Sequence, residues 1–276
     1  MKIINRISLI IVVFAATLNI RLSAGDGLLF KPLIGNIYES RLGGVLTNNQ
    51  DKLRLDIGGN YDFYQNTAKP SFLWAIGGEF FTYTRLRSEG NFKFPVETTD
   101  FYFGINASFK FSIIDLPIES RLRIAHISTH LSDGYSSNSV FFQEPFVYSR
   151  EFLDLTFASK FGDFRPYLGS IIVFSYIPKD VNLIIPQLGC EYRKHLFSQF
   201  DFALAYDLKI NGYQDQNLQK RIYKAMNMIV GGIMIRTDEN RGIFFKIERY
   251  FGANYYGQFY KQCDNYYGVG FELVYY

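Results

Sequence analysis

Two histidines and a serine occupy every second position of residues 126–130, in the stretch RLRIAHISTHLSDGY at 121–135. In an extended strand, His126, Ser128 and His130 therefore point to the same side. A histidine beside a serine can take the hydroxyl proton while the serine oxygen attacks an ester carbonyl. The spacing predicts a serine-type ester hydrolase site with Ser128 as the nucleophile and His126 as the base. His130 is an alternative base or a ligand for a lipid phosphate.

A histidine base of this kind needs a third residue that orients its ring. Glu151 is the first candidate, because it lies at the outer end of the next predicted strand and shares the parity of Leu153 and Leu155. Asp133 is the alternative, although it falls in a predicted loop. We therefore expect Glu151 to lie beside His126 on the neighbouring strand.

The residues before the histidines predict which face carries this set. Arg121 and Arg123 share the polar side of the strand, whereas Leu122 and Ile124 share the apolar side. An unbroken register places His126 on the apolar side. Two interpretations without chemistry compete with the hydrolase. In the first, His126, Ser128 and His130 are ordinary polar residues at the depth of the lipid headgroups. In the second, a β-bulge just before His126 reverses the register and turns the three side chains into the lumen.

The same alternation runs through most of the chain. In KLRLDIGGNYDFY at 52–64, the apolar residues alternate with polar or charged ones, and the pattern recurs at 101–111, 153–160 and 199–210. These segments are long enough to span a membrane, which takes about 9–11 residues per strand, whereas soluble strands average about 5–6. Aromatic residues make up 18% of the chain, as in the girdles of membrane barrels. We therefore predict an all-β, transmembrane antiparallel up-and-down β-barrel rather than a soluble sandwich.

The expected barrel has about 12 strands, with 10 as the alternative. Short turns at one end alternate with connections at the other end, four of which are long: 88–98, 132–148, 211–222 and 251–264. This alternation of short turns with long loops is typical of bacterial outer-membrane barrels. The expected strands are 38–47, 52–64, 71–87, 99–114, 117–131, 149–161, 165–177, 182–194, 199–210, 223–236, 242–250 and 265–276.

The polar faces of these strands carry both signs of charge, which predicts a lumen lined with ion pairs. Arg121 and Arg123 are expected to pair with acids such as Asp154. Mixed charges favour a plugged interior over an open channel. The residues expected to point inward are Arg54, Asp56, Lys110, Arg121, Arg123, Asp154, Lys160, Asp201 and Asp207.

Residues 1–24 are expected to be a cleaved signal peptide. A positively charged start precedes a mostly apolar run at 7–20 that is short for a membrane-spanning helix, and small residues at 22–24 fit a cleavage site. Residues 25–276 would then form a single outer-membrane barrel domain. Its last strand presents Tyr275 on the apolar side, one residue before the terminal Tyr276.

The composition and the cysteines limit the function classes. A net charge of +3 offers no basic field for nucleic acid. Cys190 and Cys263 have neither the spacing nor the histidine neighbours of a metal site, while a disulfide between them after export stays open. No motif for a cofactor or a metal ion is recognised, so none is expected.

Three segments resemble a bacterial envelope family catalogued as domain of unknown function twelve-oh-seven. LLFKPLIGNIYESRLGG at 28–44 resembles its N-terminal motif, a Phe-x-Pro-Leu start followed by an acidic segment. HISTHLSDGY at 126–135 resembles its His-x-Ser-Ser-His-Leu-Gly-Asp-Glu motif. YFGANYYGQFY at 250–260 resembles its Gly-Gly-Asn-x-Tyr-Gly-Gln-Phe segment. The resemblance implies a location in the bacterial outer membrane and no settled activity.

The His-x-Ser pair also resembles one on the barrel exterior of outer-membrane phospholipase A and of the lipid A deacylase, which is a likeness of site and not of family. The expected function is ester hydrolysis of phospholipid or lipid A. The alternative is a structural or binding barrel without chemistry, or a small pore with a plugged, charged lumen. Expected partners are outer-membrane lipids and, during insertion, the barrel-assembly machinery. The sequence does not indicate an oligomeric state.

Overall fold

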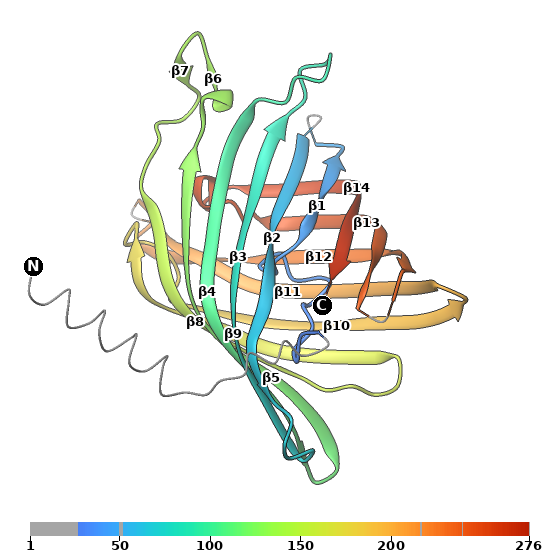
Figure 1. Cartoon of the computed structure of the whole chain (residues 1–276). Coiled ribbons are helices and arrows are strands. Elements are labelled where there is room, and N and C mark those ends of the chain that lie inside the picture. The colour runs from blue at the N-terminus through green and yellow to red at the C-terminus, as the bar shows by residue number, and fades with distance from the viewer. Residues whose placement is uncertain (1–26, 50–51, 216, 239, 276) are drawn as a thin grey trace, which may run out of the picture.

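The computed structural model describes residues 27–49, 52–215, 217–238 and 240–275, and within them twelve antiparallel strands close into one barrel (Figure 1). This confirms the predicted fold and favours twelve strands over ten. The proposed signal peptide at 1–24 lies outside the described residues. In the described part of the chain, no helix is long and apolar enough to cross a membrane.

The strands follow one another around the barrel in sequence order, and β1 closes it by pairing with β14, where Leu42 lies opposite Leu273. Every neighbouring pair is antiparallel, as the short turns require. The barrel strands are β1 (Leu42–Thr47), β2 (Lys52–Asn66), β3 (Phe72–Arg87), β4 (Val96–Ile113), β5 (Leu116–Leu131), β8 (Tyr148–Ala158), β9 (Phe164–Ile177), β10 (Ile184–Phe197), β11 (Phe200–Asp215), β12 (Lys220–Arg236), β13 (Arg241–Ala253) and β14 (Cys263–Tyr275).

The alternating sequence separates the two faces of the barrel wall. On β5, Ile124 is 47% exposed on the exterior, whereas its neighbour Arg123 is fully buried in the interior. Most of the charged residues predicted to face the lumen are buried there: Arg54, Asp56, Arg121, Arg123, Asp154, Asp201 and Asp207. The interior is therefore a packed core, in which charged side chains of both signs lie beside a buried cluster of apolar and aromatic side chains that includes Tyr102 and Phe152.

Two of the predicted lumen residues differ from the rest. Lys110 is half-buried, and its amine lies 3.2 Å from a Glu119 carboxylate oxygen. Lys160 is exposed and forms no ion pair among the described residues. The predicted ion pair of Lys160 is therefore not formed in the described part of the chain, because β8 ends before this residue and the chain has already entered a turn at the mouth of the barrel.

The two ends of the barrel have different connections. The short-turn end carries turns such as 114–115 and 198–199, while the long-loop end carries 88–95, 132–147 and 254–262. The loop at 132–147 contains η1 (Asp133–Tyr135) and a small hairpin of β6 (Ser136–Ser137) and β7 (Val140–Phe141), which protrudes at the top of Figure 1. The long loop predicted at 211–222 is wrong, because β11 and β12 pair from Asp215 and Lys220 onward.

The N-terminal segment 28–41 lies inside the barrel and forms a plug. Leu33 and Asn36 are fully buried, and the Leu29 amide donates to Asp62 on β2 over 2.8 Å. The Arg41 guanidinium donates to the backbone carbonyls of Leu33, Ile34 and Asn36, which holds the segment in a compact turn. The strand predicted to begin at 38 therefore begins later, at Leu42, since the preceding residues bind the lumen instead of a neighbouring strand.

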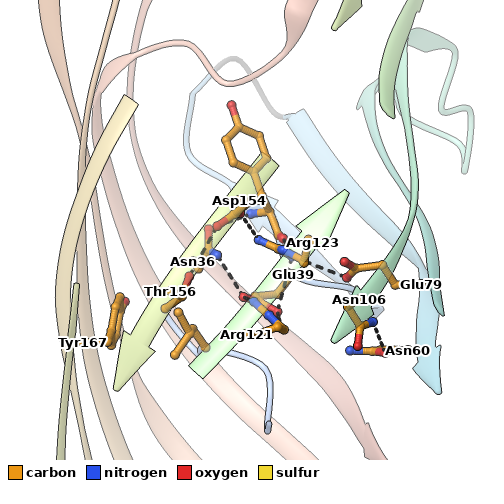
Figure 2. A network of polar contacts seen from close by, with 12 residues as sticks. Asn36, Glu39, Asn60, Glu79, Asn106, Arg121, Arg123, Asp154, Thr156 and Tyr167 are labelled. Atoms are coloured by element: carbon orange, nitrogen blue, oxygen red, sulfur yellow. Dashed lines mark hydrogen bonds and ion pairs between the residues drawn. The ribbon is translucent and has the colours of Figure 1, made fainter. Parts of the chain in front are cut away.

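Ion pairs attach this plug to the wall (Figure 2). Arg121 donates to Glu39 of the plug over 2.9 Å. Arg123 donates to the Tyr38 carbonyl over 2.8 Å, forms an ion pair with Asp154, and lies 3.4 Å from Glu79. Asp154 thus pairs with Arg123, as predicted, while Arg121 pairs with the plug, which the sequence did not indicate.

The predicted outer loop at 251–264 folds inward and covers the lumen from the long-loop end. β13 extends to Ala253, and η2 (Gly257–Phe259) is buried. The Gly257 amide donates to Asp100 over 2.9 Å. A Cβ at residue 257 would lie 2.4 Å from the Tyr148 ring, so this close approach requires glycine. The segment therefore acts as a cap opposite the plug.

The plug and the cap predict that the protein conducts little current. In planar lipid bilayers, the wild type should show no large, steady conductance. A variant that lacks residues 28–40, refolded and checked by heat-modifiable migration on a gel, should pass more current than the wild type, because the side chains of the plug no longer fill the lumen and only the cap still covers it. A large, stable conductance of the wild type would contradict the plugged interior.

Candidate functional site

The site lies where β5 pairs with β8 on the barrel exterior. His126 lies opposite Glu151, and Ser128 lies opposite Ser149. The register of β5 runs without a shift against both neighbours. The proposed bulge just before His126 is therefore absent, and the histidine keeps the outward parity of Ile124.

His126 is held from two sides. Its Nδ1 lies 2.8 Å from the Glu151 Oε1, and the two side chains are 25% and 35% exposed. The Phe103 ring of β4 lies against the imidazole, with centroids 4.8 Å apart and planes tilted by 30°. A carboxylate at Nδ1 fixes the tautomer that carries a proton there, so Nε2 is left as the proton acceptor. This arrangement suits a general base.

Ser128 lies two residues along the strand from His126, which separates their Cα atoms by roughly 6.6 Å. It is half-buried between Phe101 on β4 and Ser149 on β8. Among the described residues, no hydrogen bond joins its hydroxyl to His126. A rotation of the serine or imidazole side chain is therefore required before proton transfer. Such hydrogen bonds are often loose in the absence of substrate.

The alternative residues do not join this pair. His130 is exposed on the same face, and its ring meets the edge of Phe101 at 5.8 Å between centroids. Asp133 is exposed in η1, beyond the end of β5, and no hydrogen bond or ion pair to either histidine occurs among the described residues. Of the two acids considered from the sequence, Glu151 is the one that the fold brings to His126.

Two serines beside Glu151 were not predicted. The Ser149 hydroxyl lies 3.5 Å from the Glu151 Oε1, and Ser175 lies opposite Glu151 on β9. Ser149 shares the parity of Glu151, so that parity could have indicated it. Ser175 reaches its place through a register shift between β8 and β9 near Phe174, which no periodic pattern indicates.

Within the described residues, no group of three or more histidine, cysteine or acidic side chains is placed to hold a metal ion. Cys190 and Cys263 are free, so the disulfide left open by the sequence is not formed. The groups that the site brings together are a serine hydroxyl, an imidazole and a carboxylate.

The chain was compared with models of known protein families and with curated proteins. A family model described as "Protein of unknown function (DUF1207)" matches residues 14–275. No curated protein matches the chain.

Solved structures of outer-membrane barrels are similar in fold. Outer membrane phospholipase A from Escherichia coli has a TM-score of 0.53 and 13% identity, over 84% of this chain and 91% of that one. The outer membrane phospholipase of Salmonella typhi, a dimer with bound calcium, has a TM-score of 0.54 and 12% identity, over 89% of this chain and 94% of that one. At such identities the likeness shows the fold alone, an outer-membrane-type β-barrel.

Proposed function

We propose that this chain, which belongs to the family described as Protein of unknown function (DUF1207), is a lipid acyl hydrolase of the bacterial outer membrane. Its fold supports the location, because the similar solved barrels are outer-membrane proteins. An apolar exterior such as that around Ile124 suits contact with lipid chains. Insertion would then depend on the barrel-assembly machinery.

The observation that carries the proposal is the contact between His126 Nδ1 and Glu151 Oε1, on the exterior and beside Ser128. A carboxylate in this position orients the imidazole and stabilises the imidazolium that forms during the reaction. The pair faces the side of the barrel that meets lipid. An acyl ester of phospholipid or lipid A is therefore the substrate class that this face would encounter.

The reaction has two halves, in which Ser128 first takes the acyl group from the lipid and then passes it to water. The Ser128 hydroxyl oxygen attacks the ester carbonyl carbon while its proton passes to His126 Nε2. The imidazolium then protonates the departing alcohol oxygen, which leaves an acyl ester on Ser128. Water attacks the carbonyl carbon of this ester while its proton passes to His126 Nε2. The imidazolium then returns that proton to the Ser128 oxygen as the bond between this oxygen and the acyl carbon breaks, which releases the fatty acid and restores both residues. The site lies toward the long-loop end of β5, where water is available at the membrane interface.

The alternative is a structural or binding barrel without chemistry. The observation that favours it is the lumen, which the plug and the cap fill with buried, paired side chains such as Arg121 and Glu39. A small open pore is disfavoured by the same packing. Fatty-acid release distinguishes the two functions, because a structural barrel would leave ester lipids intact.

Replacing Glu151 with glutamine tests the orienting role. The purified wild-type barrel, in detergent micelles with phospholipid or lipid A, is expected to release fatty acid that chromatography can quantify. Glu151→Gln should lower the rate by about tenfold to a thousandfold, less than loss of the nucleophile, because the amide keeps the shape but not the charge. The assay is run with and without Ca²⁺, since the similar Salmonella typhi barrel binds calcium.

Glu144→Gln is the matched control, since this exposed glutamate lies in the loop before β8. It should leave the rate unchanged. A Glu151→Gln barrel with the wild-type rate would contradict the orienting role.

A further inference from the structure

A cavity of about 300 Å³ lies at the short-turn end of the barrel, between the plug and the wall. Its volume is at the lower limit of ordinary ligand sites, which span about 300–1,000 Å³. Charged side chains dominate its lining, with five cationic and three acidic residues. The cavity lies on the interior side, near the opposite end of β5 from His126 and Ser128. Glu119, which lines it, is separated from Ser128 by roughly 30 Å of strand.

The three acidic side chains of this cavity already have cationic partners. Arg165 Nε donates to Glu119 over 2.9 Å, and Arg165 Nη1 donates to Glu191 over 3.0 Å. The other oxygen of Glu119 lies 3.2 Å from the Lys110 amine. Asp163 forms an ion pair with Lys194, at 3.0 Å. The lining therefore keeps an excess of cationic over acidic side chains.

Two cations of the cavity, Lys160 and Arg193, form no ion pair with a carboxylate in the described part of the chain. Lys31 of the plug lies in the same positive environment. Burial lowers the pKa of its amine, and the neighbouring cations, Arg193 foremost, lower it further. A positive potential in a partly enclosed space of low dielectric attracts anions more strongly than an exposed charge does.

We propose that this cavity binds a small anion of the phosphate class, which enters from the short-turn end. Lys160 and Arg193 would supply its charge-assisted hydrogen bonds, with the fork of Arg193 suited to two phosphate oxygens. Arg165 pairs with Glu119 and Glu191, so these two carboxylates do not compete with the anion for Lys160 and Arg193. The site is independent of the hydrolase site, so either one can fail without the other.

Inorganic pyrophosphate is the probe for this site. Titrated calorimetrically into the wild-type barrel in nonionic detergent at low salt, it should bind at one site, and added salt should weaken the binding. The double variant Lys160→Gln/Arg193→Gln should bind at least about tenfold more weakly, because two charge-assisted contacts are lost. Arg193→Lys, which keeps the charge, should retain more affinity than Arg193→Gln.

Lys69→Gln is the matched control, since this exposed lysine lies in another turn of the same end and outside the cavity. It should bind pyrophosphate as the wild type does. No binding by the wild type, or equal binding by the double variant, would overturn the proposal. Lipid nanodiscs with phosphatidylglycerol distinguish the source of the phosphate: competition with pyrophosphate identifies a lipid headgroup, and its absence identifies a soluble anion.

Discussion

Replacing Ser128 or His126 with alanine should lower fatty-acid release from phospholipid or lipid A by at least about a thousandfold. Loss of Ser128 removes the atom that attacks the ester. Loss of His126 leaves that atom without the base that Glu151 holds at 2.8 Å. The double variant should be about as slow as either single variant, since the two residues act as a unit. The measurement is the initial rate of release by the purified, folded barrel.

Matched controls separate this effect from damage to the fold. Ser112→Ala removes an exposed hydroxyl at the short-turn end of β4, and His195→Ala removes another partly exposed histidine on β10. Both should keep the wild-type rate and the heat-modifiable migration of a folded barrel. Equal activity of Ser128→Ala and the wild type would refute the hydrolase and leave the structural or binding barrel.

The second large effect concerns the interior. Arg123→Met should destabilise the folded barrel by about 3–5 kcal/mol, because it leaves Asp154 and Glu79 buried without their guanidinium partner. Unfolding by urea in lipid vesicles, followed by tryptophan fluorescence, measures the change. Adding Asp154→Leu to Arg123→Met should recover part of the loss, since one buried charge is then removed.

Arg241→Met is the control, because this side chain is 75% exposed and its nearest carboxylate oxygen, on Asp238, is 3.8 Å away. It should change the unfolding free energy by less than about 1 kcal/mol. If Arg123→Met were as stable as Arg241→Met, the buried ion pairs of Arg123 would not stabilise the barrel.

The barrel itself could be predicted from the sequence because its wall has two chemically different faces. Alternation over a dozen residues, as in 52–64, constrains both the strand and its register. The same logic placed His126 on the exterior, since Leu122 and Ile124 share its parity. It also indicated Glu151, because cross-strand neighbours on one face must have matching parity.

The plug and the cap could not be predicted in this way. Glu39 meets Arg121 across 82 residues of sequence, and Gly257 meets Asp100 across 157. Such contacts depend on the closed barrel, and neither segment has a periodic pattern of its own. Tyr38 and Glu39 resemble the start of a strand locally, which explains the wrong start of β1. The register shift that brings Ser175 to Glu151 could not be predicted either, because an alternating pattern does not indicate where a bulge occurs.

The central claim is that Ser128 is a nucleophile activated by His126, and covalent labelling tests it most directly. The folded barrel in micelles is treated with a long-chain alkyl fluorophosphonate, whose phosphorus is attacked by activated serine oxygens, and digested peptides are analysed by mass spectrometry. We expect one phosphonylated peptide, with the label on Ser128, and a loss of labelling in His126→Ala. An unlabelled Ser128 in the wild type, or a label on Ser149 or Ser175 instead, would contradict the assignment.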